Sequence, residues 1–569
     1  MLIHEISKKT GVSKKAIYIY EQKGLLKVER QQNRYRSYSE ADEKRLNQIK
    51  LLRLAGVSIA DIKLLFDRVI TLAELTEKRK TEIEREYGSH SEQLALCRER
   101  LQAYQNQDYS EISFQEEETI RTVVQEGDLL AAGLDIGTTT ISATVWDLTQ
   151  RCQVEFFTLQ NKKSSQPGSG RAEQDADEIY EKAKKLLDCI LEDYPGIQTV
   201  GVTGQMHGML YIDSLGRAVS PFVTWQDQRG EEPYCEGKTY CEKFREQTGE
   251  KIATGYGLLT HFYAMRHQIV PPTAVSFCNI ADYIVMRLTG RTSPLVHSSI
   301  AASFGLFDCK AMTFQQELFQ RLGESAVHLP EVTNMPEICG AYRGVQVSAA
   351  IGDNQASFLG SVDNLEECIL LNIGTGSQIS MIDDGSQRYE NGVEVRPLFG
   401  SLRLLCGSAL CGGEAYSLTE KLFRGFVHLT HGGDRPVYDS MNQLAWQAYR
   451  EHKNPIQAEV LFRGSREHPE QTASFTGITE GNFSAGQLIL SVVTGVCQEL
   501  YNFFGSSVLG KKTVVASGNT IQKNDIFLRV IEDIFQMPVK VPRFQEEAAT
   551  GAALFSAAAG GLITMGDRT

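Results

Sequence analysis

The sequence lacks any long apolar segment. Its 569 residues contain no run of about 18 consecutive apolar residues, and the N-terminus has no apolar signal-peptide core. These absences predict a protein that is neither exported nor membrane-spanning, and we expect it in the cytoplasm. At 42% hydrophobic residues, the chain is long enough to bury more than one core, so it predicts several domains.

Closely paired cysteines are also missing. None of the 12 cysteines forms a C-x-x-C pair. The nearest neighbours, Cys406 with Cys411 and Cys235 with Cys241, have no further His or Cys at the spacing of a metal site. We therefore expect reduced and mostly buried thiols.

Positive charge is scarce outside the N-terminus. Residues 1–70 carry 15 Lys and Arg against 8 Asp and Glu, whereas the remaining chain carries 43 against 63. A basic head on an acidic body predicts a polyanionic partner for the head alone, although a solvated charged face explains any single cluster equally well.

The head begins with two short amphipathic segments. "LIHEISKKTGV" (2–12) predicts a helix that ends at a tight turn on Gly11, and Ser13 can cap a second helix that Gly24 ends. Lys14, Lys15 and Tyr18 share one face of that second helix. The pair predicts a helix-turn-helix whose second helix reads a DNA groove.

Basic and aromatic residues alternate directly afterwards, in "NRYRSY" (33–38), and two further amphipathic helices follow. With "GLL" after the second helix and "AGVS" (55–58) between the later ones, residues 2–70 resemble the MerR family of transcriptional regulators. A helical bundle with a solvated basic face is the alternative, but it explains the interleaved aromatics poorly. The resemblance implies an all-α winged helix-turn-helix domain at 1–70 that binds double-stranded operator DNA through Lys14, Lys15, Tyr18, Arg34, Tyr35, Arg36 and Tyr38.

Residues 71–106 have apolar side chains at heptad-like spacing, which resembles the dimerisation helix of that family. This pattern predicts a homodimer, although a helix that packs back on its own domain would show a similar stripe. The polar, acidic segment 107–128 is expected to be a linker.

The body opens with "LLAAGLDIGTTTISATVWD" (129–147), which predicts two strands joined by a turn. Gly137 permits close approach of a phosphate to the backbone, while Thr138 and Thr139 offer hydroxyl and N–H donors. Asp135 can hold a phosphate-bound Mg²⁺, directly or through water. An ordinary hairpin turn is the alternative.

Four further motifs follow in order: "VTGQMHGML" (202–210), "TWQDQR" (224–229), "IGDNQASF" (351–358) and "LLNIGTGSQIS" (370–380). Together they resemble the FGGY carbohydrate kinases of the actin-like ATPase superfamily over residues 129–565. The resemblance implies ATP as a cofactor with Mg²⁺, and two α/β ribonuclease-H-like domains, 129–345 and 346–569, around a cleft.

The resemblance also implies which residues contact nucleotide. Gly374 and Thr375 form a second glycine-threonine turn, and "CGGEAYSL" (411–418) and "ASGNTIQKND" (516–525) place Gly412, Gly518 and Asn519 along ADP. The segment "EEAATGAALFSAAAGG" (546–561) is expected to be a helix of small residues nearby. Close helix packing would explain the glycines equally well.

On the sugar side, the resemblance identifies Asp353 as the catalytic base. Asp227 and Arg229 are expected to order their loop as an ion pair. The residues implied to contact the sugar are Gln205, Met206, His207, Trp225 and Asn354.

These motifs imply ATP-dependent phosphorylation of a ketose. The combination of "GQMHG" with "TWQDQR" favours sedoheptulose, and xylulose is the alternative. A sugar- or nucleotide-sensing regulator with little kinase activity is a second hypothesis, but Asp135, Asp353 and the glycine turns are all present, which favours retained chemistry.

Overall fold

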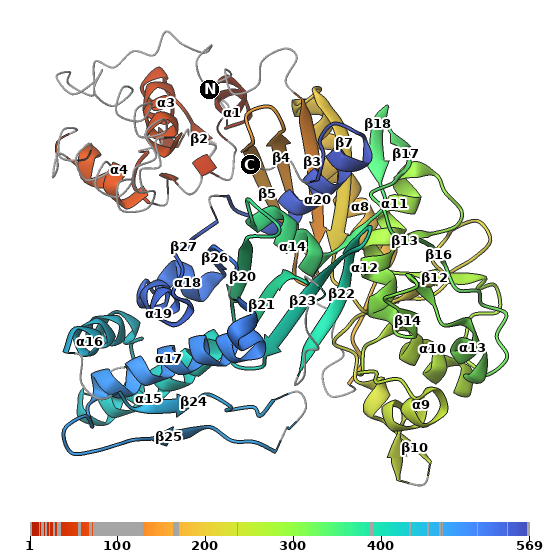
Figure 1. Cartoon of the computed structure of the whole chain (residues 1–569). Coiled ribbons are helices and arrows are strands. Elements are labelled where there is room, and N and C mark those ends of the chain that lie inside the picture. Colours follow the sequence, from red (N-terminus) through yellow and green to blue (C-terminus); the bar gives the residue numbers. More distant parts are fainter. Residues whose placement is uncertain are drawn as a thin grey trace. The chain divides into compact units, whose positions relative to one another are not determined.

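A computed structural model describes residues 129–565, apart from 163–169, 236, 384, 386–391, 432–433, 452–454, 466–467, 469, 509 and 543. It also describes parts of the N-terminal segment, namely 3–10, 12, 16–17, 20–21, 23–26, 29–30, 36–54, 59–67, 71 and 75. The chain divides into two compact units, Met1–Val123 and Val124–Thr569 (Figure 1). Among the described residues, none of the helices combines the length and the apolar character that crossing a bilayer requires.

The first unit contains helices before and after a small β-ribbon. The ribbon pairs β1 with β2 in antiparallel fashion, and Gly24 adopts a left-handed φ of 72° where the preceding helical segment ends. Ser39 and Asp42 exchange hydrogen bonds at the start of the long helix α3, a capping arrangement that stabilises its first turn. The elements are α1 (Ile3–Thr10), β1 (Glu29–Arg30), β2 (Arg36–Ser37), α3 (Glu40–Leu54) and α4 (Ile59–Phe66).

Tyr38 does not lie where a DNA-contacting side chain is expected. Its side chain is 2% exposed and belongs to the hydrophobic core of the first unit, together with Ile6, Ile17 and Leu46. A ring buried at that depth cannot reach a groove, so we assign Tyr38 to the core. The other residues expected at the DNA lie outside the described residues, as does the side chain of Arg36: Lys14, Lys15, Tyr18, Arg34 and Tyr35.

The expected dimerisation helix (71–106) and linker (107–128) also lie outside the described residues, except for Thr71 and Leu75. Leu75 is buried in the core of the first unit.

The second unit is built on two sheets. The first has seven strands in the order β17-β18-β7-β3-β4-β5, with β19 paired to β7. Its central strands are almost entirely buried, because helices cover both faces. The strands are β3 (Leu130–Ile136), β4 (Thr140–Asp147), β5 (Cys152–Gln160), β7 (Ile197–Gly204), β17 (Ile338–Tyr342), β18 (Val345–Ser348) and β19 (Ile351–Gly352).

Helices and short strands surround this first sheet. Helices α8 and α11 pack beside it, and a subdomain of short helices and ribbons follows β9. The helices are α8 (Ala176–Asp193), α9 (Tyr240–Thr248), α10 (Gly257–Arg266), α11 (Ile280–Thr289), α12 (Ser298–Ala301) and α13 (Gln316–Arg321). The short strands are β6 (Glu173–Gln174), β8 (Leu210–Ile212), β9 (Phe222–Val223), β10 (Pro233–Cys235), β11 (Lys238–Thr239), β12 (Ser276–Cys278), β13 (Leu295–His297), β14 (Phe307–Asp308), β15 (Thr313–Phe314) and β16 (Glu331–Thr333).

The second sheet has six strands in the order β22-β23-β21-β20-β26-β27. Like the first, it begins with an antiparallel hairpin whose first strand also pairs in parallel with a later strand. Its strands are β20 (Cys368–Ile373), β21 (Ser377–Ile382), β22 (Val393–Phe399), β23 (Leu402–Ala409), β26 (Thr513–Ser517) and β27 (Val539–Lys540). The neighbouring elements are α15 (Gly413–His431), α16 (Tyr438–Glu451), α17 (Ala485–Phe504), α18 (Asn519–Lys523), α19 (Ile526–Phe535), β24 (Gln457–Glu459) and β25 (Ser474–Thr476).

Two helices join the sheets. The helix α14 (Asp353–Ser361) follows β19 directly, and the C-terminal helix α20 (Glu547–Ala559) packs against α14, β3 and β7 (Figure 1). The expected small-residue helix is therefore present, and it covers the first sheet. Because β18 and β19 belong to the first sheet and α20 packs on it, the sheets divide the chain differently from the expected boundary between residues 345 and 346.

Candidate active site

The first glycine-threonine turn joins β3 to β4, as the sequence predicts. A Cβ on Gly137 would meet the Thr140 carbonyl oxygen at 2.9 Å, so this tight turn requires glycine. Asn161 supports the turn, because its amide donates to the Gly137 carbonyl at 2.9 Å. Asp135 lies two residues before the glycine, near the end of β3.

A hydrogen-bonded ring holds Thr138 beside the loop after β7. The Thr138 hydroxyl donates to the Gln205 side chain at 3.2 Å and accepts from the indole N–H of Trp225 at 3.2 Å. Gln174 closes the ring: it accepts from the Gln205 amide at 2.8 Å and donates to the Thr138 carbonyl at 3.0 Å. Trp225 is 47% exposed, so nearly half of its surface remains available to a ligand.

The loop that follows Gln205 has an unusual backbone conformation. His207 has a left-handed φ of 71°, and its ring stacks on Tyr256 with centroids 4.3 Å apart. Its Nδ1 lies 3.0 Å from the Ser303 carbonyl oxygen, which can only accept, so the neutral ring carries its proton on Nδ1 and has Nε2 as an acceptor. The Asn279 side-chain amide stabilises this loop by donating to the carbonyls of Gln205 and Gly208, both at 3.0 Å.

Asp353 is the first residue of α14, and the backbone before it is held tightly. The Thr203 hydroxyl donates to the Ile351 carbonyl at 2.7 Å, and the Gly352 N–H donates to the Ser299 hydroxyl at 2.9 Å. The Asp353 carboxylate accepts from the Asn354 backbone N–H at 2.7 Å. The Asn354 amide also lies 3.9 Å from the Met206 sulfur, so α14 and the loop after β7 meet at these residues.

Burial and neighbouring charges shift the pKa values of the two acidic residues of this region, Asp135 and Asp353. Burial raises the pKa of Asp135 to about 7, and the charges of Asp353 and Glu546 add to the rise. Burial also raises the pKa of Asp353 to about 6, while the positive charge of Arg396 limits that rise. Carboxylates with pKa values moved toward neutrality are typical of catalytic or ligand-binding sites.

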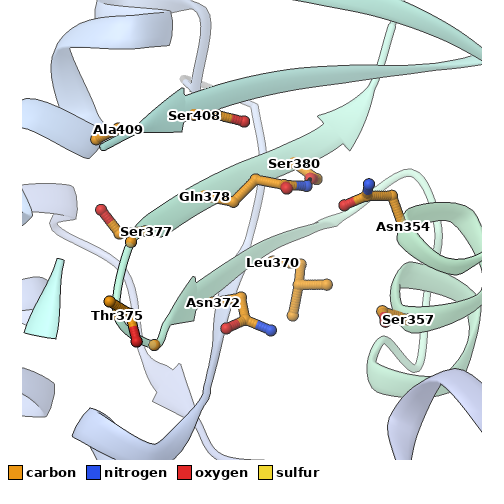
Figure 2. A pocket seen from close by; sticks show the side chains of 12 residues that line it. Asn354, Ser357, Leu370, Asn372, Thr375, Ser377, Gln378, Ser380, Ser408 and Ala409 are labelled. Atoms are coloured by element: carbon orange, nitrogen blue, oxygen red, sulfur yellow. Dashed lines mark hydrogen bonds between the residues drawn. The ribbon is translucent and has the colours of Figure 1, made fainter. Parts of the chain in front are cut away.

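The second glycine-threonine turn, between β20 and β21, lines a cavity of about 360 Å³. Figure 2 shows side chains from α14, β20, β21 and β23 around this cavity, with Asn354 on one side and Thr375 on another. The lining is mainly polar, and Asn354 is adjacent to Asp353 in the chain. The cavity therefore extends from Asn354, the residue after Asp353, to the second turn.

The glycines expected at the nucleotide gather around this second turn. The Gly412 N–H donates to the Thr375 carbonyl at 2.9 Å, and a Cβ on Gly412 would meet the Gly376 carbonyl oxygen at 2.4 Å. Gly518 has a left-handed φ of 98° and lies against the Ile373 carbonyl. Asn519 follows as the first residue of α18 and is exposed. Close backbone packing thus accounts for the glycines here, and it also keeps side chains away from the turn.

The expected ion pair of the "TWQDQR" loop is confirmed. Arg229 Nε and Asp227 Oδ1 are 2.7 Å apart, and both side chains are buried. Arg229 also pairs with Glu173 at 2.7 Å, which fastens the loop to β6. Sequence reasoning missed Gln174, Asn279 and Arg396, because a single buried polar residue far from any motif leaves no periodic signal.

Three family models match the chain. The N-terminal domain of the FGGY family of carbohydrate kinases matches residues 130–360, and the C-terminal domain of that family matches residues 430–560. The model of the MerR HTH family regulatory proteins matches residues 1–69.

Known proteins resemble the second unit over its length. A sedoheptulokinase of Mus musculus is 26% identical over 475 residues, which is 74% of this chain and 96% of the mouse protein. A xylulose kinase of Staphylococcus xylosus is 24% identical over 75% of this chain and 90% of its own. The crystal structure of gluconate kinase from Lactobacillus acidophilus has a TM-score of 0.64 at 19% identity, over 78% of this chain and 92% of that chain.

The fold and the site define a two-domain sugar kinase with paired glycine-threonine turns. The chain belongs to the FGGY family of carbohydrate kinases, and its N-terminal segment is a MerR-type helix-turn-helix module.

Proposed function

We propose that the protein phosphorylates a ketose with ATP, that sedoheptulose is its preferred acceptor, and that its N-terminal module binds operator DNA. The observation that carries the kinase proposal is the position of Asp353 at the start of α14, because the next residue, Asn354, both lies beside Met206 and lines the cavity of the second glycine-threonine turn. The preference for sedoheptulose is supported by the likeness to a sedoheptulokinase along 96% of that protein.

In the proposed reaction, a sugar hydroxyl oxygen attacks the γ-phosphorus of ATP, its proton passes to Asp353, and the bond to ADP breaks. His207 Nε2 and the Asn354 amide are placed to hydrogen-bond neighbouring sugar hydroxyls, and Trp225 offers a ring face for stacking. The backbone of both glycine-threonine turns would donate to the phosphates.

The acidic residues near the first turn suit a divalent cation. Because burial and the Asp353 and Glu546 charges raise the pKa of Asp135, a bound cation would relieve an existing cost of keeping Asp135 ionised. Among the residues that the structure describes, no three acidic, cysteine or histidine side chains could hold an ion together. This agrees with Mg²⁺, which would be held by Asp135 and phosphate oxygens and would neutralise phosphate charge.

A coupled assay of ADP release across a series of ketoses tests the kinase proposal. We expect sedoheptulose to give the highest kcat/KM, and faster turnover of xylulose or another sugar would contradict that preference. Asp353→Asn should abolish turnover because the amide cannot take a proton, yet it should retain sugar binding because the amide still bonds the hydroxyl. Calorimetric titration with sugar would measure that retention.

Xylulose remains the alternative acceptor, since a xylulose kinase is similar over 90% of its length. The alternative in which the unit only senses sugar or nucleotide would be favoured by ligand binding without turnover in the same assay.

The DNA-binding proposal is supported by the MerR model over residues 1–69 and by the basic charge of that segment. Each phosphate-contacting cation that is removed should lower the magnitude of the slope of log K against log salt by about 1. We therefore expect Arg36→Ala to reduce the slope by about this amount, as measured by titrations of operator DNA at several salt concentrations. An unchanged slope would remove Arg36 from the interface.

A further inference from the structure

A buried arginine lies at the edge of the second sheet, next to the candidate base. Arg396, on β22, is only 8% exposed. Its Nε and Nη2 atoms both bond the Glu394 carboxylate, at 3.0 and 2.5 Å. Its Nη1 is buried and has no hydrogen-bond partner among the described residues. A buried N–H donor of a cation that stays unbonded carries a desolvation penalty, so a partner at this atom would be stabilising.

Strand register places Arg396 on the face of the sheet that lines the cavity. Arg396 pairs with Leu404, and Leu404 pairs with Ile382. Two residues along the same strands, Ser380 pairs with Cys406, and Ser380 lines the cavity (Figure 2). Because side chains of directly paired residues share a face and alternate along each strand, Arg396 shares this face with Ser380.

A hydrogen bond ties β22 to α14 beside this arginine. The amide of Gln355, two residues after Asp353, donates to the carbonyl of Pro397, the residue after Arg396, at 2.9 Å. The guanidinium charge accordingly acts on the Asp353 carboxylate, and it also acts on Tyr256, whose ring stacks on His207. Arg396 therefore approaches the sugar side of the site from the second sheet.

We infer that Arg396 contacts the acceptor sugar and determines specificity by donating a hydrogen bond from Nη1 to an uncharged oxygen of that sugar. This inference rests on the proposed function of the site. Glu394 accepts from the other two nitrogens, Nε and Nη2, and balances the arginine charge, and Asp353 contributes a further negative charge. A carboxylate on the ligand would therefore meet net negative surroundings, whereas a hydroxyl or ketone oxygen meets a vacant donor.

The test measures two constants for each variant: the KM of the ketose with the highest kcat/KM, and the KM of ATP. Arg396→Met should raise the sugar KM about 10- to 100-fold, the loss expected for a charge-assisted hydrogen bond, with the ATP KM changed by less than about twofold. Arg396→Lys should recover part of the sugar affinity. Guanidinium ion added to Arg396→Ala should restore turnover, which a purely structural defect would not allow.

Arg403→Met is the matched control. Arg403 is on the neighbouring strand, but it pairs with Pro397, projects to the opposite face and bonds Asp383 at 3.0 Å. Its loss should leave the sugar KM unchanged.

An Arg396→Met variant with the sugar KM of the wild type would overturn the inference, and so would equal changes in both KM values. If Arg396→Met does not fold, the KM of the sugar and the KM of ATP measured for Arg396→Lys test the inference instead. Gluconate is the charged probe: we expect it neither to compete with the ketose nor to be phosphorylated, and tight gluconate binding that requires Arg396 would overturn the assignment to an uncharged oxygen. A wild-type chain that phosphorylates no sugar would contradict the proposed function itself.

Discussion

At the scale of residues, buried polar side chains hold the exposed ones in place. Gln174 and Gln205 are both buried, and they fix the Thr138 hydroxyl that in turn positions the Trp225 ring. Asn279 is also buried and sets the left-handed loop of His207. The geometry of the site therefore depends on buried residues such as Gln174 and Asn279, which position the groups expected to contact the substrate.

Another buried residue, His261, makes stability depend on pH. Its ring lies between Phe277 and Phe319, its Nδ1 is 2.8 Å from the Tyr211 hydroxyl, and burial lowers its pKa to about 4. The unfolded chain takes up a proton near pH 6.5 whereas the folded one does not until about pH 4. The free energy of unfolding should therefore fall as the pH drops through this window, by about 1.4 kcal/mol per pH unit from this residue.

Urea titrations between pH 6.5 and 4.5 would measure this dependence. His261→Gln should remove the contribution of His261 to the slope of the free energy of unfolding against pH. The contribution of His297, another buried histidine with a lowered pKa, should remain. An identical slope for wild type and His261→Gln would contradict the prediction.

At the scale of elements, the crossing of α14 and α20 depends on glycine. A Cβ on Gly551 of α20 would lie 1.8 Å from the Ala356 carbonyl oxygen of α14, and one on Gly360 would lie 1.8 Å from the Glu547 carbonyl oxygen. Gly133 of β3 is equally close to Ala549. Backbone atoms cannot move aside one at a time, so any side chain at these positions must push α20 away from α14 or β3.

Gly551→Ala should consequently lower the free energy of unfolding by at least about 1–3 kcal/mol. It should also reduce kcat/KM, because α14 begins at Asp353. Gly425→Ala is the helical control: a Cβ there meets no atom within 4 Å, and alanine should stabilise α15 by up to about 1 kcal/mol. Denaturant titrations of both variants would test this, and equal stabilities would count against a glycine-dependent crossing.

At the scale of the whole molecule, a basic module and an acidic kinase unit share one chain. We expect closure of the kinase around sugar and nucleotide to change operator affinity. If closure is the signal, Asp353→Asn should still respond to sugar with ATP, because it binds both without turnover. If the product is the signal, the response should vanish in this variant and return when sugar phosphate is added. Operator titrations separate these outcomes, and an affinity that is indifferent to every ligand would end the idea of coupling.

Much of this protein could be predicted from local sequence patterns. The hairpin around Gly137, the helix stop at Gly24 and the ion pair of Asp227 with Arg229 all involve residues close together in the chain. Steric limits on turns and the alternation of buried residues act over a few residues, so they leave a readable signal. The grouping of "GQMHG", "GDNQ" and the two glycine-threonine turns then indicated a sugar kinase.

Only the tertiary structure decided which distant residues complete the site. Gln174 contacts Thr138. The helix α20 packs on α14, although it begins almost 200 residues later in the chain. Tyr38 looked like part of a DNA-binding wing, but it is core, because burial depends on which elements cover a residue. Arg396 approaches Asp353 only through strand register and the packing of β22 against α14. Such contacts depend on the packing of whole elements, and no short stretch of sequence records them.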